Sequence, residues 1–381
     1  MRKGFVYDYI SGLHLELTTK CNAMCPMCNR NFKGKVRKNL PILELTLNDI
    51  KKILRPDFIK KLKLISICGV YGEPICNKDL KEILKYLYEC NNNVDIDIYT
   101  NGGLYDENWW KDLALIVKDY NCTVIFGIDG IGDTHSLHRC NTKYERVIKN
   151  ATAFINNAGK AQWDFIVFKH NENQVEDAKK LSKELGFKCF QVKKTSRFLK
   201  NIYEKDQNLD STIADYGKHP VYDSDGNIKY YIELPENPLY RNSTEDKMFE
   251  LVKQYGNIDN YFDTNEIDCE ALKTGGIFIS AKGEVFPCCS VYQQVCYKTV
   301  HNVIDASELN EYNLYIKDNL SAFDKSIEEI VNGYFFKQLV KSFKCNSIKN
   351  GKPKCCSRTC GKNLDTHKNG HTTLIKYKEE K

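Results

Sequence analysis

Residues 13–28 have the sequence LHLELTTKCNAMCPMC, and this stretch decides how the first half of the chain folds. Apolar and polar residues alternate over positions 13–17, which is typical of a half-buried β-strand. Cys21, Cys25 and Cys28 follow directly, in the spacing C-x3-C-x2-C. The stretch therefore predicts a strand that ends in a short loop with three thiols.

A strand followed by a helix recurs through the first half of the chain. Strands are expected at residues 13–17, 62–70, 94–99, 123–128, 163–168 and 188–193, and helices at residues 46–54, 77–87, 106–119, 144–157 and 173–185. Thr46 is expected to open the first helix with a capping box, and Asn77 to cap the second. Six strands that alternate with helices imply parallel pairing and a ligand face at the strand ends. Periodicity alone leaves an open barrel and a doubly wound sheet as alternatives.

The second half of the chain has a different character. Residues 200–265 are polar and irregular, which suggests a bridging or inserted segment. A cysteine-rich unit follows, and residues 277–286, with Lys282-Gly283 at their centre, predict a β-hairpin. We therefore expect an α/β domain at residues 1–199, a bridge at 200–265 and a small α+β domain at 266–381.

Composition narrows the class of protein. The chain has 381 residues, of which 42% are hydrophobic and 28% charged, as in ordinary soluble proteins. No apolar run is long enough for a transmembrane helix, and the first residues lack the apolar core of a signal peptide. With 17 cysteines, complete pairing is impossible, so a cytoplasmic protein with thiols free for metal is expected.

Charge is concentrated at the C-terminal end. The net charge is +6, and residues 337–381 carry 12 Lys and Arg against 3 Asp and Glu. Such an end can attract RNA, an acidic peptide or a reduced electron carrier. The alternative is that the lysines offset nearby thiolates.

The three thiols after the first strand suit iron–sulfur chemistry. They can hold three irons of a [4Fe–4S] cube and leave the fourth iron open for substrate or cofactor. The alternative is a structural zinc site completed by a distant residue, although structural zinc more often uses C-x2-C pairs.

Further motifs follow this loop in a characteristic order. They are Gly72-Glu73-Pro74 after the second strand, Thr100-Asn101-Gly102 after the third, and Gly127-Ile128-Asp129-Gly130 with His135 and Arg139 after the fourth. Together with the C-x3-C-x2-C loop, this order resembles the radical S-adenosylmethionine (SAM) superfamily over about residues 1–195. The resemblance implies a partial (β/α)6 TIM-like barrel with a [4Fe–4S] cluster held by the three cysteines.

The resemblance also implies a set of residues that bind SAM. They are Met27, Gly72, Glu73, Pro74, Thr100, Asn101, Asp129 and Arg139. Glu73 would meet the amino group, Arg139 the carboxylate, and Met27 the adenine. The family usually has Ser where this chain has Gly127, which places more weight on Arg139. The plain alternatives are a solvated turn for Glu73, a surface ion pair for Arg139 and simple packing for Met27.

The C-terminal cysteines resemble the SPASM/twitch extensions that carry auxiliary iron–sulfur clusters. The full SPASM run C-x2-C-x5-C-x3-C is absent, so a single cluster is expected. The proposed ligands are Cys269, Cys288, Cys356 and Cys360, with Cys355, Cys345 and Cys289 as substitutes. A structural zinc ribbon is the alternative. Six other cysteines match no ligand spacing and are interpreted as small buried apolar residues: Cys68, Cys76, Cys90, Cys122, Cys140 and Cys189.

His170 and Asn171 follow the fifth strand, where they could contact a ligand or cap the next helix.

The function implied by the resemblance is reductive cleavage of SAM to a 5′-deoxyadenosyl radical that abstracts hydrogen from a substrate. A peptide or protein is the first expectation for that substrate; a small-molecule dehydrogenase and an RNA-modifying enzyme are the alternatives. Flavodoxin or ferredoxin would donate the electron, and no catalytic side chain is nominated. The non-enzymatic alternative is a cluster-bearing regulator that binds nucleic acid.

Overall fold

The computed structural model describes residues 4–199, 217–242, 258–301, 310–362 and 371–376, together with 247, 250, 251 and 253–256. Residues 363–370 and 377–381, which hold part of the basic C-terminal end, lie outside the described residues. Within the described ranges, no helix combines the length and apolar character needed to cross a membrane.

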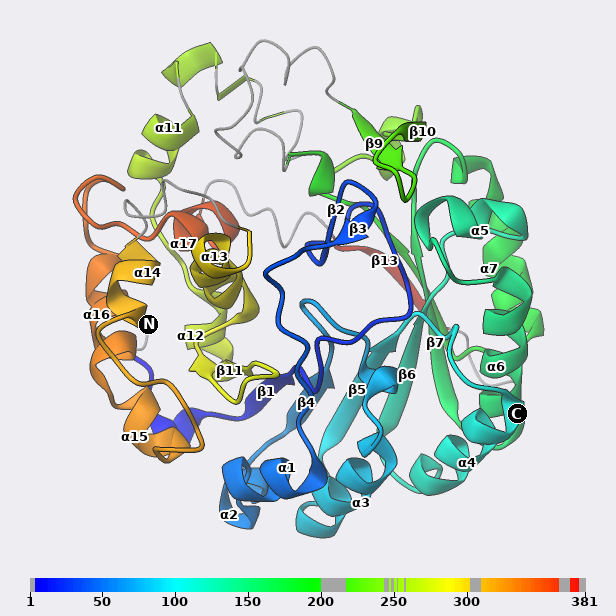
Figure 1. The fold of residues 1–381 in the computed structure, drawn as a ribbon, viewed down its shortest axis with the longest axis horizontal. Helices are drawn as coiled ribbons and strands as arrows, with labels where there is room; N and C mark the ends of the chain where they lie inside the picture. Colours follow the sequence, from blue (N-terminus) through cyan, green and yellow to red (C-terminus); the bar gives the residue numbers. More distant parts are fainter. Residues whose placement is uncertain are drawn as a thin grey trace.

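A nine-stranded sheet forms the centre of the molecule, in the order β12-β11-β1-β4-β5-β6-β7-β8-β13. Its six parallel barrel strands are β1 (Gly12–Leu15), β4 (Leu64–Ile67), β5 (Asp95–Thr100), β6 (Cys122–Gly127), β7 (Lys160–Ile166) and β8 (Cys189–Lys193). Each lies beside the next in chain order, so the sheet winds in one direction. This excludes the doubly wound alternative and confirms the partial TIM-like barrel (Figure 1).

Helices cover the outer side of the curved sheet (Figure 1). They are α1 (Leu47–Ile53), α2 (Pro56–Lys60), α3 (Leu80–Cys90), α4 (Glu107–Val117), α5 (Asp133–His138), α6 (Tyr144–Asn156) and α7 (Val175–Glu184). Outward-facing strand residues pack on them; the ring of Phe126 lies 5.1 Å from that of Trp110. This packing buries the apolar positions of the strands and leaves the other face of the sheet to line the barrel interior.

The helix starts test two predicted caps. Thr46 forms the predicted capping box with Asp49. Asn77 does not cap α3, whose N-cap is Asp79. The Asn77 amide instead donates to the carbonyls of Leu17 and Leu45, because it lies buried under the loop that follows β1.

The C-terminal region continues the same sheet. The predicted hairpin is present as β11 (Gly276–Ile279) and β12 (Val285–Phe286), and β11 pairs in parallel with β1, so that Ile277 lies opposite Leu13. On the other edge, β13 (His371–Lys376) pairs antiparallel with β8. The helices of this region are α12 (Glu270–Thr274), α13 (Cys289–Thr299), α14 (Asn310–Tyr315), α15 (Ile327–Val331), α16 (Tyr334–Ser342) and α17 (Lys354–Thr359).

The bridge between the two halves is more regular than expected where it is described. Strands β9 (Lys218–Tyr222) and β10 (Ile228–Glu233) form an antiparallel hairpin, and α11 (Ile258–Thr264) follows. The prediction of an irregular segment is wrong here. The signal overlooked was the turn at Gly226, whose φ of 88° a glycine adopts without strain.

Short elements complete the described chain. They are the hairpin strands β2 (Asn31–Phe32) and β3 (Lys35–Val36), and the 3-10 turns η1 (Tyr7–Tyr9), η2 (Pro74–Cys76), η3 (Glu172–Gln174), η4 (Arg197–Leu199) and η5 (Pro238–Tyr240).

Candidate active site

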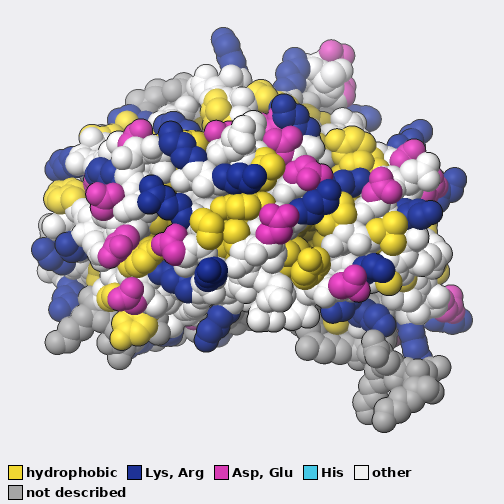
Figure 2. All heavy atoms as spheres, turned by 90° about the horizontal axis from the view of Figure 1, so that it is seen from below, with side chains coloured by type: hydrophobic (Ala, Val, Ile, Leu, Met, Phe, Trp, Pro, Cys, Tyr) yellow, Lys and Arg dark blue, Asp and Glu magenta, His cyan; other side chains and the backbone are white. Residues whose placement is uncertain are grey.

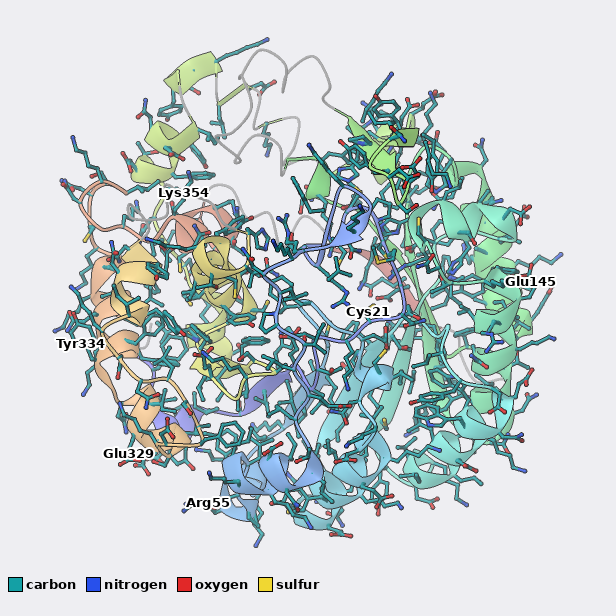
Figure 3. All side chains as sticks on the ribbon, viewed as in Figure 1. Cys21, Arg55, Glu145, Glu329, Tyr334 and Lys354 are labelled. Atoms are coloured by element: carbon teal, nitrogen blue, oxygen red, sulfur yellow. The ribbon has the colours of Figure 1, made fainter. Side chains whose placement is uncertain are left out.

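The three-cysteine loop leaves β1 at the carboxyl edge of the parallel sheet, and Cys21 lies near the middle of the molecule (Figure 3). The Sγ of Cys21 accepts a hydrogen bond of 3.4 Å from the amide of Ala23. Burial raises the pKa of Cys21, and the charges of Glu73, Cys25 and Cys28 raise it further. The three thiols therefore share one electrostatic environment, in which a bound cation would favour their thiolate forms.

Hydrogen bonds from outside the loop hold its backbone in place. The Asn31 side chain donates to the Cys25 carbonyl at 3.0 Å, and the amide of Met24 donates to the Cys140 carbonyl at 2.9 Å. Buried Arg30 donates to the carbonyls of Thr19 and Tyr71. The loop is thus braced against the β4 and α5 ends of the barrel.

The donor set fits a cluster better than a single ion. Among the described residues, no three His, Cys, Asp or Glu side chains gather closely enough to hold one metal ion. A [4Fe–4S] cube spreads its thiolates over separate irons and so suits three separated thiols on one loop. A ready tetrahedral zinc site would need its ligands closer together.

Gly72 lets the loop after β4 approach the loop after β1. A Cβ at this position would lie 1.7 Å from the Thr18 carbonyl oxygen, so no other residue fits. The amide of Glu73 then donates to the Lys20 carbonyl at 2.8 Å, and Pro74 begins the turn η2. The close approach places the Glu73 carboxylate directly beside the cysteine loop.

Glu73 is buried and its carboxylate is bound by neighbouring amides. Its Oε2 accepts from the backbone and side chain of Asn101 at 2.9 and 2.7 Å. Burial raises the pKa of Glu73, while the hydrogen bonds from Asn101 and Thr100 oppose the shift. The Asn101 side chain also donates to the Asn22 side chain of the cysteine loop. The predicted residues Glu73 and Asn101 therefore meet next to this loop. A buried carboxylate here can bind an ammonium group.

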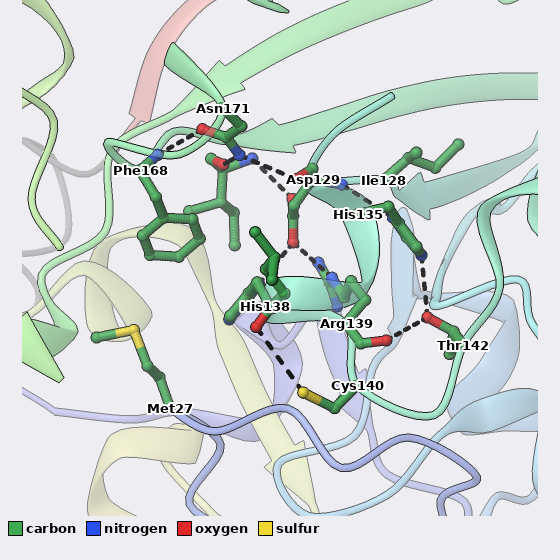
Figure 4. A network of polar contacts seen from close by, with 12 residues as sticks. Met27, Ile128, Asp129, His135, His138, Arg139, Cys140, Thr142, Phe168 and Asn171 are labelled. Carbon is green, nitrogen blue, oxygen red and sulfur yellow. Dashed lines mark hydrogen bonds and ion pairs between the residues drawn. The ribbon is translucent and has the colours of Figure 1, made fainter. Parts of the chain in front are cut away.

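Asp129 is the centre of a second polar network (Figure 4). Its Oδ2 accepts from Arg139 Nε and from His138 Nδ1 at 2.8 Å, and its Oδ1 accepts from the Ile166 amide at 2.8 Å. Burial opposes ionisation, but Arg139 and His138 outweigh it and hold the pKa of Asp129 well below its usual range. Both oxygens are engaged by the protein, so Asp129 positions Arg139 rather than facing a ligand.

The histidines of this network differ in role. Burial lowers the pKa of His135 to about 4, and the neutral ring bridges the Asp129 amide and the Thr142 hydroxyl. His138 is 2% exposed, and its Nε2 has no partner in the described part of the chain. Sequence reasoning missed His138, which the helical spacing from His135 could have indicated.

Arg139 lies above Gly127 and close to the cysteine loop. A Cβ at Gly127 would lie 2.4 Å from a terminal nitrogen of Arg139. Of the Arg139 guanidinium nitrogens, only Nε makes a hydrogen bond within the described residues, and the nearby charges include Cys25 and Glu73. The two terminal nitrogens therefore remain able to bind a carboxylate.

The Met27 side chain lies in an apolar cluster, and its proposed contact with adenine stays a prediction. Its side chain is 2% exposed and packs in a cluster with Phe168, Phe198, Val221 and Ile232. The unexpected hairpin β9–β10 supplies two of these partners, so simple packing accounts for the Met27 side chain.

Asn171 neither caps a helix nor faces a ligand. Its amide donates to the carbonyls of Asp129 and Ile166, and its oxygen accepts from the Phe168 amide (Figure 4). It therefore joins the ends of β6 and β7. The neighbouring His170 stacks on Phe168, with ring centroids 5.4 Å apart.

The four auxiliary cysteines lie in or beside three helices. Cys269 precedes α12, Cys288 precedes α13, Cys356 lies within α17, and Cys360 directly follows that helix. Burial raises the pKa of Cys269 first and the charges of Cys356 and Cys360 add to it; for Cys288 the added charges include Cys356 and Cys269. Cys269 and Cys288 each lie within electrostatic range of Cys356, which is compatible with a shared cluster.

Two of the three substitute cysteines, Cys355 and Cys289, lie in different places. Cys355 Sγ lies 3.9 Å from Cys356 Sγ, inside the same group. Cys289 is electrostatically coupled to Cys68 and Glu16 on the barrel side. Of the cysteines interpreted as buried, only Cys122 is fully buried, and the other five are partly exposed.

The barrel interior carries a polar lining that sequence reasoning missed. Lys193 of β8 forms an ion pair with Asp164 of β7 and lies over the Tyr99 ring. Gln162 bonds Asp164 at 2.7 Å and Gln191 at 3.2 Å. The signal was present, because every second residue of these strands is polar and the barrel turns those residues inward.

Glu16 closes the lining next to the C-terminal region. It is 0% exposed, its Oε1 accepts from the Tyr71 amide at 2.7 Å, and its Oε2 has no partner among the described residues. Burial raises the pKa of Glu16 to about 7. Glu16 directly follows β1, and the sequence placed it on the polar side of the strand expected at residues 13–17, with no sign of its burial.

Comparisons with known proteins agree with this geometry. Residues 15–183 match the family model described as "Radical SAM superfamily". The chain is 22% identical over 304 residues to GTP 3′,8-cyclase of Aliarcobacter butzleri, covering 78% of this chain and 85% of that protein. It is 25% identical over 281 residues to AdoMet-dependent heme synthase of Methanosarcina barkeri, covering 72% and 75%.

A solved structure shares the fold. Streptococcus suis SuiB bound to precursor peptide SuiA has a TM-score of 0.52 and 15% identity, with 92% of this chain and 76% of that chain covered. At this identity the likeness concerns the arrangement of helices and strands. It extends beyond the barrel into the cysteine-rich C-terminal region.

Proposed function

We propose that this chain is a radical SAM enzyme whose substrate is a peptide or protein, and the match of residues 15–183 to that family model supports the first part. The cofactors of such an enzyme are a [4Fe–4S] cluster and SAM. When reduced by an external one-electron donor, the bound cluster would supply one electron to the sulfonium of SAM, whose carbon–sulfur bond would break to give methionine and a 5′-deoxyadenosyl radical that takes a hydrogen atom from the substrate. The proposed cluster ligands are Cys21, Cys25 and Cys28.

The protein's own task is to hold and orient SAM. We assign the methionyl ammonium to Glu73, which is buried and already fixed by Asn101. We assign the methionyl carboxylate to the two terminal nitrogens of Arg139. Asp129 accepts a hydrogen bond from the Nε of the same guanidinium. A charged fork fixed at one end loses little conformational entropy when it binds.

An auxiliary cluster on Cys269, Cys288, Cys356 and Cys360 completes the proposal. The electrostatic coupling among these thiols supports the assignment. A cluster there would accept an electron from the substrate radical or bind the substrate directly.

The polar barrel lining is the observation that carries the substrate assignment. Side-chain amides from Gln162 and Gln191 can pair with the amide and carbonyl groups of a peptide backbone. The one lysine of these pairs, Lys193, is neutralised by Asp164, and Asp97 adds a further acid. Such a lining suits a neutral or cationic polar chain.

A nucleotide triphosphate suits this lining poorly. Triphosphate binding calls for several unpaired cations or a helix N-terminus aimed at the ligand. The described barrel strands offer an ion-paired lysine and additional carboxylates instead. We therefore place the chain with the peptide-bound SuiB rather than with GTP 3′,8-cyclase, both of which it resembles.

An anaerobic turnover assay tests the proposal. The reconstituted protein is incubated with SAM and dithionite, with GTP or with a peptide fraction from the producing cells, and products are followed by mass spectrometry. We expect 5′-deoxyadenosine in all cases and a mass change confined to a peptide. Conversion of GTP, or of small alcohols alone, would overturn the substrate assignment while leaving the radical chemistry intact.

A further inference from the structure

We propose that the hairpin β2–β3 is the docking surface for an acidic electron-carrier protein. The inference rests on the proposed function, because a radical SAM enzyme needs one electron from outside for each cleavage. It concerns a surface that the cofactor and substrate sites leave unused. The supporting observations are the charge of this segment, its exposure and its attachment to the cysteine loop.

The segment around the cysteine loop has one sign of charge. Residues 17–43 contain six Lys and Arg and no Asp or Glu. Lys20 is paired with Glu44, and Arg30 is buried against backbone carbonyls. The remaining four lie on the hairpin or directly after it: Lys33, Lys35, Arg37 and Lys38.

The hairpin presents its lysines to solvent. Lys33, Lys35 and Lys38 are exposed, and within the described residues none of them forms an ion pair. Phe32 is 52% exposed at the same tip, and Lys33 and Arg37 lie 5.6 and 5.0 Å from its ring. An exposed aromatic ring among cations provides a contact that is both apolar and positively charged.

The face shown in Figure 2 lacks this pattern. On the face shown in Figure 2, Lys and Arg side chains are interspersed with Asp and Glu. The turn next to the hairpin carries Asp223, whose carboxylate accepts from the amides of Asp225 and Asn227 in its own turn. A second segment without Asp or Glu, residues 330–364, carries eight Lys and Arg. The hairpin is the one attached to the cysteine loop through Asn31.

The turn geometry and the packing of the hairpin fix its position. Lys33 and Gly34 have φ values of 47° and 74°, as in the tight two-residue turns of hairpins. A Cβ at Gly34 would lie 2.2 Å from the Asp223 carbonyl oxygen, so the tip packs on the β9–β10 turn. A rigid basic tip binds an incoming protein with little loss of its own conformational entropy.

The hairpin is also attached directly to the proposed cluster ligands. The amide of Asn31 donates to the Cys28 carbonyl at 3.0 Å, and its side chain donates to the Cys25 carbonyl at 3.0 Å. Electron transfer between proteins becomes rapid only when the two redox centres are close. A carrier seated on the hairpin meets this requirement, because the first strand residue contacts the cysteine loop.

Acidic carrier proteins complement this surface. Opposite charge raises association rates by about 10- to 1000-fold at low salt and loses its effect as salt is added. In the docked complex the carrier is oxidised by one electron and the [4Fe–4S] cluster is reduced by one. No bond in either protein is made or broken.

Charge reversal on the hairpin tests the proposal with the reconstituted full chain. The variant carries Lys33→Glu, Lys35→Glu and Lys38→Glu, and flavodoxin with its reductase is the probe carrier. We expect the dissociation constant for flavodoxin, measured by calorimetry, to rise about tenfold or more at low salt. The rate of 5′-deoxyadenosine formation with flavodoxin should fall by a similar factor, while the rate with dithionite should not change.

A matched control reverses three exposed lysines on or beside the outer helices: Lys111, Lys143 and Lys149. This variant has the same net charge and should keep the wild-type affinity for flavodoxin. Equal loss in both variants, or no loss in either, overturns the docking surface. A parallel fall with dithionite also overturns it, because the hairpin would then serve the cluster site. Failure of the proposed function is distinct, since the wild type would form no 5′-deoxyadenosine with either reductant.

Discussion

Gly127 and Arg139 compete for the same space at the end of β6. A Cβ on Gly127 would lie 2.4 Å from a terminal nitrogen of Arg139, a separation that real Cβ atoms do not show. The glycine that departs from the family's usual serine is therefore the residue that admits the guanidinium. Arg139 can lie over the end of β6 because Gly127 has no side chain there.

Gly127→Ala should weaken SAM binding more than it weakens the fold. The added methyl group displaces the Arg139 fork, and we expect the dissociation constant for SAM to rise about tenfold, or about 1.4 kcal/mol. Equilibrium dialysis of the reconstituted protein measures it. Gly276→Ala is the control, since its nearest neighbour lies at 3.5 Å, and it should leave SAM affinity unchanged. Unchanged affinity in Gly127→Ala would contradict the role given to Arg139.

Asp129→Asn should destabilise the protein and loosen Arg139. Removing one partner of a buried ion pair costs about 3–5 kcal/mol, because the remaining charge is left without compensation. Urea unfolding should show this loss, together with weaker SAM binding. Asp133→Asn, an exposed carboxylate in the first turn of α5, should change neither measurement. If both variants behave alike, Asp129 does not position Arg139.

Glu16 gives the stability of the fold a pH dependence that one substitution should remove. The pKa of Glu16 is raised to about 7 by burial, so the folded state holds a proton that the unfolded state has lost. The stabilisation is complete below the unfolded pKa and is lost as the pH rises through 7. Between pH 5.5 and 7 the loss of unfolding free energy amounts to about 2 kcal/mol. The wild type should lose this much unfolding free energy over that pH range, whereas Glu16→Gln should not. Parallel plots of unfolding free energy against pH for the two proteins would refute the raised pKa of Glu16.

Cys25→Ala and Cys288→Ala should separate the two proposed clusters. Cys25→Ala should abolish 5′-deoxyadenosine formation, whereas Cys288→Ala should retain SAM cleavage but lose product. Each variant should contain roughly half of the wild-type iron, if each proposed site holds one [4Fe–4S] cluster. Iron analysis and chromatography of the nucleoside check both statements. SAM cleavage by Cys25→Ala would show that the cluster binds elsewhere.

The ion pair of Asp164 and Lys193 should affect substrate use without affecting SAM. The double variant Asp164→Asn with Lys193→Gln keeps the polar lining but removes both charges, so that no single charge is left buried. We expect the KM for the peptide to rise about tenfold, while substrate-free SAM cleavage stays at the wild-type rate. A fall in the substrate-free rate would place the pair in the SAM site instead.

Local sequence was sufficient for the barrel. Strands and helices of the first half were predictable because each carries its own periodicity, and Thr46 opens α1 through a bond that spans three residues. That the three cysteines share one loop was predictable from their spacing, and their role as ligands stays a prediction. The hairpin β9–β10 was missed because the surrounding residues 200–265 are mostly polar, although its second strand reads IKYYIE.

The amino-acid sequence by itself determined the parallel α/β half, the hairpin at residues 277–286 and the loop of three cysteines, because those features depend on neighbours along the chain. Only the tertiary structure decided that β11 joins β1, that Asp129 faces Arg139 and that Lys193 meets Asp164 inside the barrel. These contacts join residues on different strands and loops. Their partners are selected by burial and by the curvature of the sheet, neither of which a local pattern contains.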